Sequence, residues 1–150
     1  MTATEVREYS AQARSSDVFG RVLCQAREHH FVIDGPPWNG CPGEALRPGE
    51  AFLAGVAACA VELIQMFARD DELELGGIDV AMRGLFDRDN PLRDDLTLFN
   101  DVSIRIEIGG VTEDQARDLA DRFARRCPLY GSVAASGTKV EMDVRAGDSA

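Results

Sequence analysis

The sequence predicts an α+β fold, in which groups of strands are separated by single helices. Stretches of alternating apolar and polar residues occur in three groups along the chain, and such alternation is typical of half-buried strands. Two helical stretches separate these groups, without the regular strand–helix repeat of a doubly wound α/β protein. The 150 residues suit one domain, which we expect to span residues 1–150.

The N-terminal part is predicted to form a small group of strands. Residues 21–27 alternate, and the turn "SSDVFG" before them allows pairing with a strand at residues 5–14. Residues 30–34 predict a third strand. Glycine and proline then crowd "GPPWNGCPGEALRPGE", so this segment is predicted to be a loop within the domain.

A long helix is predicted from about residue 49 to residue 69. It is apolar on nearly every side up to Glu62, which is typical of a helix in the middle of a protein. Its uninterrupted apolar run, residues 51–61, is too short to span a bilayer. We therefore expect no membrane segment here.

The C-terminal half contains the clearest strand patterns. Residues 77–86 and 96–108 alternate, and residues 138–144 predict the last strand. Between them, Thr112 and Gln115 form the pattern of a capping box, which begins a helix. The apolar stripe of this helix leads to Cys127, and Pro128 should end the helix there.

Charge and composition exclude several classes of function. The formal net charge is −10, and no basic cluster is present to neutralise a nucleic-acid backbone or an anionic membrane. The N-terminal "MTATEVREYS" lacks the basic and apolar regions of a signal peptide, so we expect a cytoplasmic protein. In that compartment cysteines stay reduced unless they pair for chemistry.

The sequence carries none of the common metal or cofactor motifs. It has no C-x-x-C, and the adjacent His29 and His30 would point to opposite faces of a strand. No G-x-S-x-G supports a Ser-His-Asp site, and "GGIDV" opens a strand instead of a phosphate-binding helix. We therefore expect no metal and no cofactor.

The four cysteines are the remaining candidates for chemistry. Cys24 shares the apolar face of its strand and is expected to fill the core, while Cys41 lies in the glycine- and proline-rich loop with no evident role. Cys59 and Cys127 each lie on the apolar stripe of a helix and should face the same core. Their spacing alone leaves simple packing and thiol chemistry both open.

Two of these cysteines stand in motifs that resemble a known family. "RPGEAFLAGVAACAVELI", followed some seventy residues later by "RRCPLYGSV", is similar to the OsmC/Ohr family, and so is the upstream "HHFVIDGPPWNGCPGEALRPGEA". The resemblance covers roughly residues 22–144. It implies antiparallel sheets packed around two central helices, an intertwined homodimer, and dithiol-dependent reduction of organic hydroperoxides.

The resemblance also implies the roles of individual residues. Cys59 would be the peroxidatic cysteine and Cys127 the resolving one. A peroxidatic cysteine reacts as a thiolate, which nearby positive charge stabilises. The negative end of a helix dipole beside Cys127 would make it the poorer attacker. In the family, an arginine held by the glutamate that opens the helix supplies the charge, which points to Arg21 and Glu50.

Glu50 departs from the pattern of the hydroperoxide reductases, because Gly49 separates it from Pro48. It precedes Cys59 by nine residues, which is about half a turn round the helix and ~13 Å along its axis. Glu50 therefore either holds an arginine, serves the site of a second subunit, or only favours the helix dipole. The offset is typical of the less characterised OsmC-like branch.

The expected partners follow from this chemistry. Phe52, Val56 and Leu63 would line an apolar pocket for an organic hydroperoxide, and a dithiol of the lipoyl type would reduce the Cys59–Cys127 disulfide. Two alternatives remain open. The first is a non-enzymatic OsmC-like protein that binds a hydrophobic small molecule. The second is a redox sensor that uses the same cysteine pair.

Overall fold

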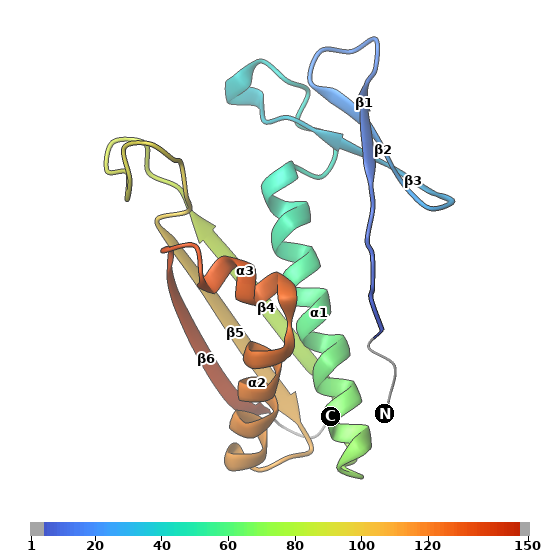
Figure 1. The fold of residues 1–150 in the computed structure, drawn as a ribbon, viewed down its shortest axis with the longest axis vertical. Coiled ribbons are helices and arrows are strands. Elements are labelled where there is room, and N and C mark those ends of the chain that lie inside the picture. The colour runs from blue at the N-terminus through green and yellow to red at the C-terminus, as the bar shows by residue number, and fades with distance from the viewer. Residues whose placement is uncertain (1–4, 148–150) are drawn as a thin grey trace. The chain divides into compact units, whose positions relative to one another are not determined.

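The computed structural model describes residues 5–147 and has the predicted α+β fold (Figure 1). Its strands are β1 (Gln12–Ser15), β2 (Arg21–Ala26), β3 (His29–Asp34), β4 (Ile78–Leu85), β5 (Asp101–Gly109) and β6 (Lys139–Gly147). Its helices are the short 3₁₀ helix η1 (Pro37–Asn39), α1 (Pro48–Asp70), α2 (Glu113–Arg126) and α3 (Pro128–Ala134). The chain divides into two compact units, Met1–Ala51 and Phe52–Ala150. The expectation of one domain over residues 1–150 stays a prediction.

The first unit contains an antiparallel sheet in the order β1-β2-β3. Its first strand is shorter than predicted, because residues 5–11 lie outside any strand and pairing starts at Gln12 opposite Gln25. The register of β2 and β3 sets Arg21 directly opposite Asp34. The following loop contains η1 and leads into the first turn of α1.

The second unit contains a sheet in the order β4-β5-β6. β4 and β5 are antiparallel, but β5 and β6 are parallel, which corrects the expectation of purely antiparallel sheets. The reason is the connection: α2 and α3 lie between β5 and β6, and a helical crossover returns the chain to the same end of the sheet.

The core of the second unit forms where α1 and α2 pack on one face of this sheet. The α1 stripe has four-residue spacing, as expected for one side of a helix. Alanine at two of its positions leaves room for neighbouring side chains. Fully buried members of this core are Val56, Ala60 and Ile64 of α1, Ile106 and Ile108 of β5, and Leu119, Ala120 and Phe123 of α2.

α1 is longer and less covered than an interior helix of a single chain should be. It has 23 residues, and its most apolar window has a mean hydropathy of 1.9 but is only 22% buried. By length and composition alone it could cross a membrane, so the expectation of no membrane segment stays a prediction. Since core helices of soluble proteins pass the same test, this is weak evidence for a span. Most residues of this apolar window are therefore not fully buried in the structure.

α2 begins with the predicted capping box and ends before Pro128, as predicted. The Thr112 side chain accepts a hydrogen bond from the Gln115 backbone N–H, and the Gln115 side chain accepts one from the Thr112 N–H. A third helix, which the sequence analysis missed, then starts at Pro128 itself. Proline suits the first position of a helix, because its fixed φ is helical and no N–H is lost.

Candidate active site: the Cys59–Cys127 pair

The packing of α1 against α2 brings two cysteine sulfurs together. The Cys127 Sγ donates a hydrogen bond to the Cys59 Sγ across 2.9 Å, although 68 residues separate them in the sequence. Both are free thiols. A disulfide bond is about 2.05 Å long, so the two sulfurs need to approach by less than about 1 Å to form one.

The two thiols differ in accessibility. Cys59 is partly exposed, whereas Cys127 is buried with 3% of its surface exposed. The buried Phe123 lies one turn before Cys127, and its ring packs on Tyr130 with the ring centroids 5.2 Å apart. These rings hold the segment around Cys127 against the core. A small molecule from solvent therefore reaches Cys59 more easily than Cys127.

Cys127 lies where two helices meet. It is the C-cap of α2 and also the N-cap of α3, and its Sγ accepts a hydrogen bond from the Tyr130 backbone N–H at 3.3 Å. The expectation that a negative helix end alone surrounds Cys127 is therefore incomplete. That expectation depended on Pro128 ending all helical structure, and α3 adds a backbone donor on the other side of the sulfur.

The surroundings of Cys59 favour its protonated form. Burial, the hydrogen bond to Cys127, and the negative charges of Cys127 and Glu62 raise the pKa of Cys59 to about 12. Within the described residues, no cation acts against this shift.

Arg21 binds two carboxylates within the first unit. Its Nε and Nη2 donate to the two carboxylate oxygens of Asp34 at 2.9 Å each, and Nη2 also donates to Glu44 at 2.8 Å. Asp34 is completely buried and accepts two backbone N–H groups, from Glu44 and Ala45. The hydrogen bonds from Arg21 hold the pKa of Asp34 well below its usual range. This network fastens the loop after β3 to the sheet.

Glu50 is not among the hydrogen-bond partners of Arg21 in the described residues, so its expected role of holding an arginine stays a prediction. Its carboxylate accepts a hydrogen bond from the Arg47 backbone N–H at 2.9 Å, in the first turn of α1. The cause is the register of the hairpin, which offers Arg21 the buried Asp34 on the neighbouring strand. As the structure stands, Glu50 satisfies a backbone donor at the start of a helix.

The three predicted pocket residues lie in different environments. Val56 is completely buried in the core and offers no surface to a ligand. Leu63 packs against the same core. Phe52 is 49% exposed and stacks on Phe99 with the ring centroids 6.3 Å apart. Of the three, Phe52 alone has a large exposed aromatic face, so the pocket stays a prediction.

The other two cysteines lie in the first unit. Cys24 is buried in β2, in agreement with the expected packing role. Cys41 fits between two glycines, because a Cβ built on Gly20 or on Gly35 would lie only 2.3 or 2.5 Å from its Sγ. These glycines make room for the Cys41 side chain, so this side chain helps to pack the loop after β3 against the hairpin.

The match to a protein-family model decides to which family the chain belongs. A model of the family described as OsmC-like protein matches residues 41–143, which include both cysteines of the pair. The chain belongs to the OsmC-like family. No curated protein matches it.

Solved structures of OsmC-like proteins have the same fold. An OsmC-like protein from Mycoplasma pneumoniae has a TM-score of 0.81 at 17% identity, over 94% of this chain and 99% of that one. An organic hydroperoxide resistance protein from Legionella pneumophila has 0.74 at 18%, over 96% and 100%. A putative organic hydroperoxide resistance protein from Vibrio cholerae has 0.69 at 22%, over 95% and 94%.

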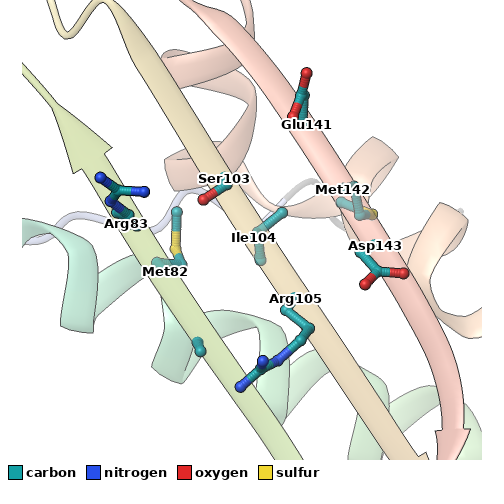
Figure 2. A pocket seen from close by; sticks show the side chains of 9 residues that line it. Met82, Arg83, Ser103, Ile104, Arg105, Glu141, Met142 and Asp143 are labelled. Carbon is teal, nitrogen blue, oxygen red and sulfur yellow. The ribbon is translucent and has the colours of Figure 1, made fainter.

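A cavity of about 590 Å³ lies against β4, β5 and β6 of this OsmC-like chain. Figure 2 shows its lining, which includes Arg83, Arg105, Glu141 and Asp143. These exposed side chains alternate with the core-facing residues of the same strands. Because charged walls do not suit an alkyl or aryl group, we do not assign a hydroperoxide to this cavity.

The described part of the OsmC-like chain shows no candidate metal site. Among residues 5–147, no three His, Cys, Asp or Glu side chains gather as a metal site would require.

The structure also adds residues that the sequence analysis missed. Asp34 could have been found by pairing the two predicted strands at residues 21–27 and 30–34, because it is the cross-strand neighbour of Arg21 in β2 and β3. Tyr130 could not, because its role depends on the unpredicted α3.

Proposed function

We propose that the chain is a thiol-dependent peroxidase that reduces organic hydroperoxides through Cys59 and Cys127. The observation that carries this proposal is the 2.9 Å separation of the two sulfurs. Packing alone does not require two thiols from distant segments to meet, whereas a disulfide cycle does. The names of the Legionella and Vibrio relatives support the same chemistry.

In the first step, the Cys59 thiolate attacks one peroxide oxygen. The O–O bond breaks, the alkoxide leaves and takes up a proton to become an alcohol, and the sulfur is oxidised to a sulfenic acid. The partial exposure of Cys59 suits it to this step, since the attacking sulfur has to meet the substrate.

In the second step, the Cys127 sulfur attacks the sulfenic sulfur, the S–S bond forms, and water leaves. The short separation makes this condensation fast and protects Cys59 from further oxidation. A dithiol, of the lipoyl type or similar, then reduces the disulfide by two exchange reactions and becomes a disulfide itself. No metal or cofactor takes part. The cycle suits a reducing compartment, so we propose a cytoplasmic protein.

The cycle needs a positive charge near Cys59, because its pKa of about 12 leaves almost no thiolate at neutral pH. The resemblance assigns this role to Arg21. In the first unit, Asp34 and Glu44 both bind Arg21. Glu44 is the exposed one of the two, with 78% of its side chain accessible. Under the proposal, Arg21 releases Glu44 and keeps Asp34 when it acts, and Glu50 has a capping role.

We also propose that the active form is a homodimer. Most residues in the apolar window of α1 lie outside its buried stripe. A second copy of the chain would cover this surface, as closed symmetric dimers commonly do. Such cover would also exclude water from the vicinity of Cys59.

The raised pKa of Cys59 favours a second candidate function, which is the binding of a hydrophobic small molecule without catalysis. A protein that binds a hydrophobic small molecule would keep both thiols protonated and unreactive. A redox sensor would form the disulfide once but would not turn over. Turnover with excess dithiol therefore separates the peroxidase from both alternatives.

The test is consumption of cumene hydroperoxide with excess dithiothreitol or dihydrolipoamide. We expect the wild-type protein to turn over many times and Cys59→Ser to lose this activity. Cys24→Ser and Cys41→Ser are the matched controls and should keep it. Turnover by Cys59→Ser at the wild-type rate, or a wild-type protein that consumes no peroxide, would contradict the proposal.

A further inference from the structure

Gly55 lies one helical turn before Cys59 on α1. Residues four apart are neighbours on a helix surface, with about 5–6 Å between their Cβ positions. Gly55 and Cys59 are both partly exposed, whereas the core-facing Val56 and Ala60 are completely buried. The helix surface next to the Cys59 thiol is therefore open, and position 55 adds no side chain to it.

Leu129 of α3 reaches the same turn of α1. It follows Cys127 by two residues, and its Cδ2 would lie 3.7 Å from a Cβ built on Gly55. Next to this contact, the Cys127 Sγ lies 2.9 Å from the Cys59 Sγ. These two contacts set the Leu129 side chain as an apolar wall beside the cysteine pair. Leu129 is 39% exposed, so this wall has surface to offer a ligand.

The packing of the described chain does not require a glycine at position 55. A glycine inside a helix costs about 0.5–1 kcal/mol relative to alanine. Among the described residues beyond the local helix, Leu129 alone comes within 4 Å of the built Cβ, at an ordinary van der Waals distance. The described chain would therefore accept alanine here. The cost of the glycine is not offset by its own packing, and the space that it leaves beside Cys59 suits a ligand.

We propose that Gly55 and Leu129 form the subsite for the organic group of the hydroperoxide, and that Gly55 limits the size of this group. The inference deepens the proposed peroxidase function and rests on it. Gly55 lies about 6 Å from Cys59 along the helix axis. This length suits a compact group, such as the phenyl ring of cumene hydroperoxide, when the peroxide oxygen lies at the sulfur. A second copy of the chain over α1 would close the open side of the subsite.

Peroxides of different bulk test this size limit. Cumene hydroperoxide, tert-butyl hydroperoxide and hydrogen peroxide all react with the same thiolate, so the pKa of Cys59 cancels in the ratios of their kcat/KM values. Gly55→Ala adds one methyl group to the subsite. We expect it to lower the ratio for cumene hydroperoxide over hydrogen peroxide by about tenfold or more, and the ratio for tert-butyl hydroperoxide by less. An unchanged ratio would overturn the inference.

The matched control is Gly49→Ala, which makes the same substitution in the first turn of α1. Among the described residues beyond the local helix, nothing lies within 4 Å of a Cβ built on Gly49, and Cys59 follows ten residues later. This variant should keep the wild-type ratio. Sedimentation of both variants tests whether a second copy, instead of a ligand, fills the space at Gly55. Dissociation of Gly55→Ala where the wild-type protein stays associated, with equal losses for all three peroxides, would overturn the inference.

The role of Leu129 has its own test. Leu129→Ala removes the apolar wall, so the phenyl ring loses its contact while hydrogen peroxide loses nothing. We expect the preference for cumene hydroperoxide over hydrogen peroxide to fall by about tenfold. A preference equal to that of the wild-type protein would contradict the assignment of Leu129 to the subsite.

Alkylation of Cys59 separates this inference from the proposed function. N-phenylmaleimide and N-methylmaleimide attack the same thiolate and differ in the bulk of one group, and peptide mass spectrometry follows both rates. Gly55→Ala should lower the phenyl-to-methyl ratio, whereas Gly49→Ala should not. Equal ratios in the wild-type protein and both variants would overturn the inference. If the wild-type protein consumes no peroxide, the peroxidase function has failed, while a lowered alkylation ratio would still support the subsite.

Discussion

The Cys127 Sγ lies 2.9 Å from the Cys59 Sγ, although α1 and the junction of α2 and α3 are far apart in the sequence. The partly exposed sulfur belongs to the middle of a long helix, and the buried one caps two shorter helices. This asymmetry supports the proposal that the first sulfur attacks the peroxide and the second resolves the product.

Removal of the resolving thiol should stop the cycle at the sulfenic acid. After one equivalent of cumene hydroperoxide, Cys127→Ser is expected to carry a sulfenic acid on Cys59, because no neighbouring sulfur can condense with it. Dimedone labelling followed by mass spectrometry detects this species. The wild-type protein should label weakly under the same conditions. Equal labelling of the two proteins would show that Cys127 does not resolve Cys59.

Removal of Cys127 should also lower the pKa of Cys59. The hydrogen bond and the charge of Cys127 both raise that pKa, so Cys127→Ala leaves only burial and Glu62 to do so. Since the thiolate fraction rises as the pKa falls, the variant should be alkylated faster by iodoacetamide at about pH 8. The rate measured from about pH 7 to about pH 10 checks this. The same pH profile in both proteins would contradict the coupling of the two thiols.

The buried Asp34 should make the first unit sensitive to acid. Its pKa is held well below the value of about 3.9 in an unfolded chain, mainly by Arg21. The resulting stability is present above that unfolded value and is lost as the pH falls towards the folded one. Asp34→Asn should therefore lower the Tm at neutral pH and weaken the loss of Tm below about pH 4.

The matched control for this change is Asp89→Asn, in an exposed segment after β4. It should leave both the Tm and its dependence on pH close to those of the wild-type protein. If both variants show the same acid profile as the wild type, Arg21 and Asp34 do not stabilise the loop as described.

The core beneath the cysteine pair should dominate the stability of the second unit. Phe123 is completely buried and supports Tyr130, so Phe123→Ala should reduce the free energy of unfolding by about 3–5 kcal/mol. Urea denaturation measures this loss. Leu96→Ala, at a position that is 52% exposed, should change it by less than about 0.5–1 kcal/mol. Similar losses in the two variants would contradict the assigned core.

Local patterns predicted much of the fold. The capping box at Thr112 and the alternation of β4 and β5 depend on neighbouring residues, and both are confirmed. The parallel pairing of β6 and the start of α3 at Pro128 were missed. The first depends on the path of a crossover. The second depends on a residue that can both end one helix and begin the next.

The sequence predicted some contacts of the candidate site and not others. The meeting of Cys59 and Cys127 follows from two apolar helix stripes that share a core, and the family motif identified both residues. The partners of Arg21 depend on the register of a hairpin and on the path of the loop that carries Glu44. A motif does not encode such contacts; in the structure Glu50 accepts the Arg47 N–H, and its role at the site stays a prediction.

Peptide mapping of the oxidised wild-type protein tests the central claim most directly. After one equivalent of cumene hydroperoxide and quenching of free thiols, the account predicts a single disulfide between Cys59 and Cys127, with Cys24 and Cys41 still reduced. A disulfide that involves Cys24 or Cys41 in place of this pair, or four thiols that all remain free, would contradict it.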